Sequence, residues 1–154
     1  MITNTRLIPF KVFHDTYGSL IPLEVDEDIP FKIERAYYIF DVGKDIRRGF
    51  HSHKELEQVL VCVHGSVKIL VKTPFESEDI VLDKPDTGLY IGPAVWREMY
   101  DFSPDAVLMV FASKHYNTLD YIRNYEDYVS FAKEYFDKKG KNKFCRYGGH
   151  GLND

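Results

Sequence analysis

The sequence predicts an all-β fold, a sandwich or barrel of antiparallel strands, with one amphipathic helix near the C-terminus. Three observations lead to this prediction. Short runs rich in β-branched and aromatic residues alternate with turn signals up to about residue 113. The turns follow one another closely, which is typical of sandwiches and barrels built from many short strands. Beyond residue 117 the apolar residues recur at spacings of three and four, as in a helix that buries one face.

Ten runs have the composition of strands, and each is bounded by residues that favour turns. The predicted strands cover residues 7–13, 19–24, 33–41, 48–53, 59–63, 67–72, 78–82, 88–91, 96–102 and 106–112. The run Val59–Val63 is too apolar and too rich in β-branched residues to be a loop, and Gly65 marks its end. We find no internal repeat and no low-complexity linker, so the sequence predicts one domain.

The predicted helix begins near Asn117, where that residue or Thr118 can cap it and Asp120 lies in the first turn. Its apolar stripe consists of Leu119, Ile122, Tyr125, Val129, Ala132 and Phe136. We expect it to pack on the outside of the barrel. The polar segment after Phe136 predicts an end to the helix, so we expect a single domain of residues 1–137 that includes the helix and a loose polar tail of residues 138–154.

Composition narrows the class of protein. A chain of 154 residues with 44% hydrophobic residues can bury a core of its own. The net charge of −4, with acids and bases interspersed, predicts no nucleic-acid partner. We find no signal peptide and no stretch that could span a membrane. Cys62 lies in an apolar strand and Cys145 in the tail, which favours a reducing compartment, so we expect a cytoplasmic protein.

The segment Arg-Gly-Phe-His-Ser-His, residues 48–53, is the most informative part of the chain. His51 and His53 are two positions apart, so on a strand both imidazoles point to the same face. A turn at residues 54–57 would bring Gln58 close to the pair, and we expect Gln58 to be a substrate-binding residue. This layout resembles the first motif of a cupin barrel, in which His-x-His and a later glutamate bind a metal. Gln58 stands where that glutamate is expected, which favours histidine acid/base chemistry.

Three interpretations of the histidine pair remain. As metal ligands they would need further donors, and counting five residues past Pro93 gives Glu98 rather than a histidine. The resulting set of His51, His53, Gln58 and Glu98 is a poor one. As structural residues they would simply line a barrel wall. Beside a bound carbonyl sugar, they could take a proton and return it, because imidazole titrates near working pH. We favour the last interpretation and expect neither a metal nor a cofactor.

Two arginines are candidates for binding an anion. Arg48 directly precedes the histidine motif, and Arg123 lies in the predicted helix. Each could be a solvated surface charge, which is the usual fate of an arginine. A diphosphate would instead use them as forked hydrogen-bond donors.

Three aromatic residues could also contact a ligand. Trp96 and Tyr90 flank a Gly-Pro turn and could stack on a base or a sugar, or could simply pack in the core. Tyr37 lies in a predicted strand whose alternate residues face the interior, and its phenol could bond a substrate oxygen. The pattern does not decide whether Tyr37 or Tyr38 points inward.

These segments closely resemble the sugar-nucleotide 3,4-ketoisomerases, small cupins that act on dTDP-4-keto-6-deoxyglucose on the way to 3-amino-3,6-dideoxysugars. The resemblance extends to about Phe136, and the matching stretches lie at residues 18–20, 29–31, 37–41, 48–54, 58–62, 88–96 and 120–123. It implies a double-stranded β-helix (jelly-roll barrel) that forms a homodimer without a metal. His51 and His53 fall on the family's catalytic pair, and the arginines and aromatics would hold dTDP. Thr16-Tyr17 departs from the arginine expected before Gly18.

We therefore expect an isomerase that converts dTDP-4-keto-6-deoxy-D-glucose to a dTDP-3-keto-6-deoxyhexose through an enediol. A 3,5-epimerase of the same substrate is the nearest enzymatic alternative. A non-catalytic sugar-nucleotide sensor is the alternative from another class. The departure at residues 16–17 leaves open which C4 epimer is made, because that region is thought to influence the product.

Overall fold

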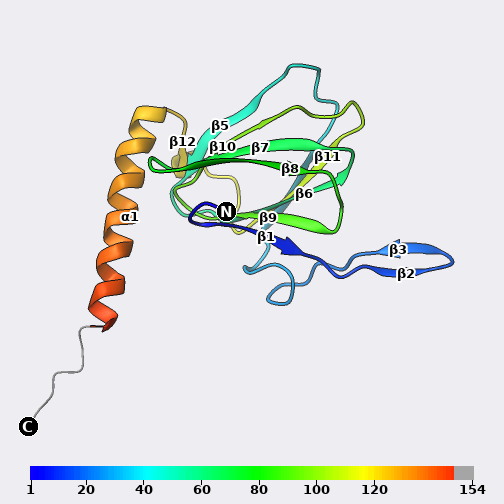
Figure 1. Cartoon of the computed structure of the whole chain (residues 1–154), viewed down its shortest axis with the longest axis horizontal. Coiled ribbons are helices and arrows are strands. Elements are labelled where there is room, and N and C mark those ends of the chain that lie inside the picture. The colour runs from blue at the N-terminus through cyan, green and yellow to red at the C-terminus, as the bar shows by residue number, and fades with distance from the viewer. Residues whose placement is uncertain (148–154) are drawn as a thin grey trace, which may run out of the picture.

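Two five-stranded antiparallel sheets face each other in the computed structural model of the chain, which describes residues 1–147 (Figure 1). The strands are β1 (Thr5–Pro9), β2 (Phe13–Asp15), β3 (Gly18–Leu20), β4 (Arg35–Ile39), β5 (Arg48–His53), β6 (Gln58–His64), β7 (Val67–Lys72), β8 (Ser77–Leu82), β9 (Thr87–Ile91), β10 (Trp96–Tyr100), β11 (Val107–Ala112) and β12 (Tyr121–Ile122). One sheet has the order β1-β9-β6-β11-β4, and the other β12-β5-β10-β7-β8. The predicted all-β, cupin-like architecture is confirmed.

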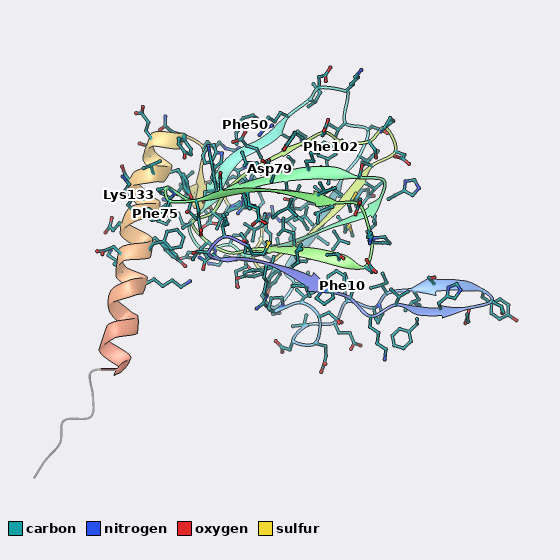
Figure 2. All side chains as sticks on the ribbon, in the orientation of Figure 1. Phe10, Phe50, Phe75, Asp79, Phe102 and Lys133 are labelled. Carbon is teal, nitrogen blue, oxygen red and sulfur yellow. The ribbon has the colours of Figure 1, made fainter. Side chains whose placement is uncertain are left out.

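The main hydrophobic core lies between the two sheets, where side chains fill the interior (Figure 2). The position of strand β6 explains why apolar and polar residues do not alternate in its sequence. Leu60 and Cys62 face this core, whereas Val59 and Val61 face a second cluster on the outer side of the sheet. That outer cluster is covered by Ile29 and Phe31 from the loop before β4. Both faces of β6 are therefore buried, which favours a continuous run of β-branched residues.

The helix begins later and ends later than the sequence predicts. Residues Thr118–Asp120 form a short 3₁₀ helix, η1, which is followed by β12, and the α-helix α1 spans Tyr125–Tyr147. Asn117 caps η1, and Asn124 caps α1 by accepting a hydrogen bond from the backbone N–H of Asp127 at 3.0 Å. The expected loose tail from residue 138 is therefore wrong as far as Tyr147, and residues 148–154 lie outside the described part.

Helix α1 packs against the outside of the sandwich through one aromatic cluster, as expected. Tyr128 and Ala132 are buried against Ala94 and Trp96, and the hydroxyl of Tyr128 donates to the carbonyl of Ala94 at 2.8 Å. The helix stands beside one end of the sheets (Figure 1). Neither helical segment in residues 1–147 has the length and apolar character needed to cross a membrane.

The hairpin of β2 and β3 projects away from both sheets (Figure 1). The predicted strands at residues 7–13 and 19–24 are each only partly strand, because the chain leaves the sheet after Pro9 to form this arm. Phe13 and Leu20 pair across the hairpin and are 50% and 62% exposed. The arm therefore presents apolar side chains to its surroundings rather than to its own core.

Candidate active site

A bulge in β5 sets the direction of the first histidine. His51 pairs with Arg97 of β10, but Gly49 pairs with Glu98, so Phe50 is an extra residue on β5. Gly49 and Phe50 both have positive φ angles, 94° and 57°. A Cβ atom on Gly49 would lie 2.8 Å from the carbonyl oxygen of Arg97, so only glycine fits there. Bulges of this kind re-aim the side chains that follow them.

His51 and His53 share one face of β5, as predicted, but they occupy different depths. Their ring centroids are 4.9 Å apart with an interplanar angle of 82°. His51 lines a cavity, whereas His53 is fully buried behind it. Tyr121 of β12 pairs directly with His53, and its ring lies 4.3 Å from that of His53 and 5.0 Å from that of His51.

Asp120 connects the segment before β12 to the turn at residues 54–57 and to His53. Its carboxylate accepts hydrogen bonds from the backbone N–H groups of Glu55 and Leu56 at 3.0 and 3.2 Å. One oxygen also lies 3.4 Å from Nδ1 of His53. The predicted turn at residues 54–57 is therefore tied to η1, and a carboxylate stands beside the deeper histidine. Sequence reasoning placed Asp120 in a helix turn and missed this role.

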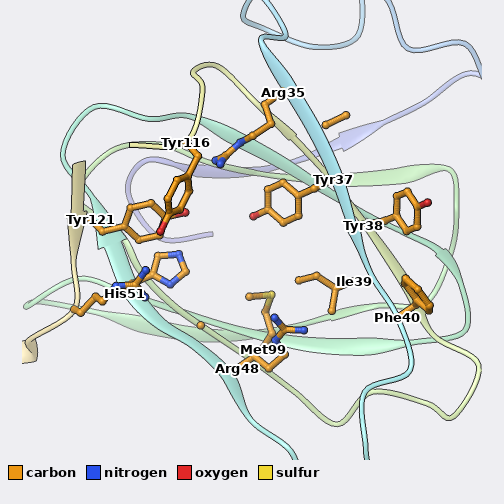
Figure 3. A pocket seen from close by; sticks show the side chains of 13 residues that line it. Arg35, Tyr37, Tyr38, Ile39, Phe40, Arg48, His51, Met99, Tyr116 and Tyr121 are labelled. Carbon is orange, nitrogen blue, oxygen red and sulfur yellow. The ribbon is translucent and has the colours of Figure 1, made fainter. Parts of the chain in front are cut away.

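The cavity beside His51 has a volume of about 600 Å³ and lies between the two sheets at one end (Figure 3). The two candidate anion ligands, Arg48 and Arg123, line it, and Tyr37 points into it while Tyr38 stands at its outer edge (Figure 3). The described residues that line the cavity include three arginines and no carboxylate. Such a cavity favours an anionic ligand of sugar-nucleotide size.

The third arginine, Arg35, was not predicted. Its guanidinium points into the cavity (Figure 3), and its Nε and Nη2 atoms are buried without a hydrogen-bond partner among the described residues. The rings of Tyr37 and Tyr116 hold it from either side, with centroids 5.3 and 5.7 Å from its Cζ atom. A buried guanidinium without a partner is costly, so this geometry suits an incoming anion. In the sequence, Arg35 stands at the start of an apolar strand, and this position gave no indication that it could bind a ligand.

Behind the cavity lies a chain of hydrogen bonds that links Arg97, Gln58 and Tyr37. The Nη1 atom of Arg97 donates to Oε1 of Gln58 at 2.6 Å, and Nε2 of Gln58 donates to the hydroxyl of Tyr37 at 3.1 Å. Gln58 is only 3% exposed and belongs to the sheet opposite His51. It contacts Tyr37 and Arg97 and does not line the cavity, so its expected direct contact with substrate stays a prediction.

Burial and charge keep both histidines neutral. Burial, followed by the positive charge of Arg97, lowers the pKa of His51 from its usual 6.5 to about 3. The same two causes lower the pKa of His53 further. Burial raises the pKa of Tyr37, so its phenol keeps its proton. Arg97 is 1% exposed, and no carboxylate lies within salt-bridge distance of it among the described residues.

Two predicted ligands lie away from the cavity. Trp96 is 3% exposed and packs on Tyr125 and Tyr128 of α1, on the outer face of β10. The hydroxyl of Tyr90 donates to Glu57 at 2.6 Å within the outer cluster. Strand alternation explains the position of Trp96, because Arg97 rather than Trp96 faces inward, and Tyr90 packs on the outer cluster of the other sheet. Neither aromatic lines this cavity, and their stacking on a bound ligand stays a prediction.

The structure also separates the residues of the alternative metal set. Glu98 follows the inward-facing Arg97 and points outward, where its two carboxylate oxygens accept hydrogen bonds from Arg47 at 2.8 Å and Trp96 at 2.9 Å. Among residues 1–140, whose side chains the structure describes, no group of three or more His, Cys, Asp or Glu is placed to hold a metal ion. The interpretation of these residues as one metal site therefore has no geometric support.

Comparisons with known proteins agree with this geometry. A family model described as FdtA (WxcM-like, C-terminal) matches residues 3–133. A TDP-4-oxo-6-deoxy-alpha-D-glucose-3,4-oxoisomerase from Aneurinibacillus thermoaerophilus is 48% identical over 136 residues, which cover 88% of this chain and 98% of the relative. The crystal structure of QdtA, a sugar 3,4-ketoisomerase from Thermoanaerobacterium thermosaccharolyticum in complex with TDP, is 56% identical with a TM-score of 0.86, over 88% of this chain and 99% of that one.

An H51N mutant of QdtA has also been solved in complex with TDP-4-keto-6-deoxyglucose; it is 55% identical with a TM-score of 0.85, over 87% of this chain and 97% of that one. The fold and these relatives define an isomerase of the sugar-nucleotide 3,4-ketoisomerase class. The chain belongs to the FdtA family.

Proposed function

We propose that this enzyme converts dTDP-4-keto-6-deoxy-D-glucose to a dTDP-3-keto-6-deoxyhexose without a metal or a cofactor. The observation that supports this most is the cavity itself, in which a neutral His51 stands beside three arginines and no carboxylate. The arginines can bind the diphosphate of the substrate, and the neutral imidazole of His51 can remove a proton from a carbon atom. The 3-keto product has the carbonyl that an aminotransferase would need to make a 3-amino-3,6-dideoxysugar.

In this mechanism His51 removes the proton from C3 of the bound sugar. The C3 proton is acidic because it is α to the C4 carbonyl, and an enediolate forms across C3 and C4. Return of a proton to C4 then leaves the carbonyl at C3. The ring centroid of His53 lies 4.9 Å from that of His51, and Asp120 lies beside His53. His53 therefore fixes the ring of His51 and can take part in the proton transfer.

The diphosphate lies along Arg35, Arg48 and Arg123 in this proposal. Each arginine can give a charge-assisted hydrogen bond, and Arg35 already has two unpartnered donors. The QdtA complexes with TDP and with TDP-4-keto-6-deoxyglucose support the choice of nucleotide. We assign the site to binding and catalysis from these contacts and these relatives.

One NMR time course with dTDP-4-keto-6-deoxy-D-glucose in deuterated water tests the proposal. The expected product has its carbonyl at C3, with deuterium at C4, and its C4 configuration follows from the coupling constants. A 3,5-epimerase would keep the carbonyl at C4 and place deuterium at C3 and C5. A non-catalytic sensor would bind the ligand and incorporate no deuterium at all. Either of these two results would refute the assignment.

We also propose that the protein is a homodimer. An apolar groove of about 450 Å³ lies between the base of the projecting arm and the outer face of β6 and β11. Val12, Val63 and Phe111 line it, and β1 of the same sheet is an edge strand with Leu7 45% exposed. A second copy of this chain would cover the groove and the edge. Sedimentation that shows an active monomer would refute this.

A further inference from the structure

The proposed reaction moves two protons, and the histidines account for only one of them. One proton leaves carbon C3, and one arrives at carbon C4. The second proton moves between oxygens, because the substrate carries a hydroxyl at O3 and a carbonyl at O4, whereas the product carries the reverse. A group that both donates and accepts at oxygen can make this second transfer. This requirement follows from the proposed function and rests on it.

Tyr37 has the geometry for such a group. Its hydroxyl points into the cavity toward the side occupied by His51 and Tyr121 (Figure 3). The phenol oxygen accepts a hydrogen bond from Nε2 of Gln58, so its own proton is free to point at a ligand. Tyr116 and Tyr121 also line the cavity, but among the described residues neither hydroxyl receives a hydrogen bond from the protein.

Arg97 fixes the direction of this contact. A guanidinium can only donate, so Oε1 of Gln58 must face Arg97 and Nε2 must face Tyr37. The guanidinium is itself anchored to the carbonyl of Val95 through Nε at 3.3 Å and Nη2 at 3.1 Å. The chain of donors therefore runs one way, from a buried cation to a phenol oxygen. Such a chain strengthens the phenol as a donor to a negative oxygen.

We propose that Tyr37 carries the hydroxyl proton from O3 to O4, and that Gln58 holds Tyr37 in the orientation for it. After His51 has taken the C3 proton, O4 carries the negative charge and O3 still carries its proton. Tyr37 gives its phenol proton to O4, and the O3–H proton moves to the phenol oxygen. The bonds formed and broken are two O–H bonds each, the negative charge ends on O3, and Tyr37 is regenerated. Protonation at C4 then completes the reaction.

The decisive measurement is how the enediolate partitions in deuterated water. Return of deuterium to C3 regenerates labelled substrate, whereas transfer between the oxygens leads to product. In Tyr37→Phe we expect the ratio of C3 exchange to product formation to rise at least tenfold over wild type, by NMR of recovered substrate and product. Tyr100→Phe removes a phenol that binds Asp79 outside the cavity and should leave the ratio unchanged. An unchanged ratio in Tyr37→Phe, or a rise in Tyr121→Phe instead, would overturn the assignment.

Gln58→Glu tests the orientation of Tyr37 with almost no change of shape. The new carboxylate would pair with Arg97 and accept the phenol proton, which turns that proton away from the cavity. We expect the same rise in the ratio, measured with EDTA present, while dTDP binding by calorimetry is retained. Wild-type partitioning in this variant would refute the role of Gln58. A wild-type enzyme that gave no C3 ketone would refute the proposed function. A wild-type enzyme that isomerises, with an unchanged ratio in Tyr37→Phe, would refute only the role of Tyr37.

Discussion

The depressed pKa of His51 predicts an enzyme that keeps its activity in mild acid. At pH 5, an unperturbed imidazole with a pKa of 6.5 is only ~3% neutral. With the pKa of His51 lowered to about 3, by burial first and by Arg97 second, the base remains almost entirely neutral at that pH. We expect kcat/KM to change less than about twofold between pH 8 and pH 5, whereas an unperturbed base would lose about 30-fold.

The same shift has the opposite effect on stability. Below pH 6.5 the unfolded chain binds a proton at His51 and the folded chain does not, so protonation favours unfolding. The free energy of unfolding therefore falls as pH decreases from 6.5 toward 3, by about 1.4 kcal/mol per pH unit. Between pH 6.5 and pH 5 the contribution of this single histidine amounts to about 2 kcal/mol.

Two assays test this opposition directly. Initial rates measured by NMR at constant ionic strength give the pH profile of kcat/KM. Urea unfolding at pH 6.5 and pH 5 gives the loss of stability, and His51→Asn is the matched control because asparagine does not titrate there. We expect wild type to lose about 2 kcal/mol more than this variant. An acid limb near pH 6.5 in the rate profile, or equal losses in the two proteins, would show that His51 has an ordinary pKa.

Three further predictions concern the same cavity. His51→Asn and His53→Asn should each lower kcat by about 10²-fold or more while dTDP binding by calorimetry is retained, and near-normal turnover in both would end the histidine mechanism. Arg48→Ala or Arg123→Ala should raise KM at least about tenfold, since one charge-assisted bond contributes about 1.5–3 kcal/mol; Arg6→Ala, whose side chain stacks on an outer tyrosine, is the control and should leave KM unchanged. Full activity should persist after EDTA treatment and dialysis, and a loss that Zn, Mn, Fe or Ni restores would refute metal independence.

Much of the strand pattern could be predicted because it is local. Strands β5 and β7 have the bounds that the sequence predicts, since alternation and turn residues are properties of short segments. The common face of His51 and His53 follows from the same period of two. Strand pairing is not local. Strands β5 and β6 follow each other in the chain but belong to opposite sheets, so they do not form the hairpin that the sequence suggested, and Gln58 is linked to the site through Arg97 and Tyr37.

The start of the helix shows a different limit. Leu119 and Ile122 match the helical stripe by spacing, yet they belong to η1 and β12. Pairing of Tyr121 with His53 draws this segment onto the edge of the sheet, and tertiary contacts of that kind override local period. Asn124 offered a signal for the true start, because it is a good cap followed by Glu126 and Asp127 in the first turn.

Arg97 shows why sequence reasoning found the histidines and missed what makes them useful. In the sequence it is only the neighbour of Glu98 at a position where a metal-binding cupin would have its last ligands. In the fold, strand alternation turns Arg97 inward, directly across from His51. There one buried cation helps to keep two histidines neutral and orients Gln58 toward Tyr37. A metal ion would use imidazole lone pairs as ligands, whereas a guanidinium donates to Gln58 and leaves those lone pairs free to accept a proton from carbon. This chain has Gln58 where a metal-binding cupin would have a glutamate, which is consistent with these roles of Arg97. A carboxylate at position 58 would neutralise the guanidinium of Arg97 and accept the phenol proton of Tyr37.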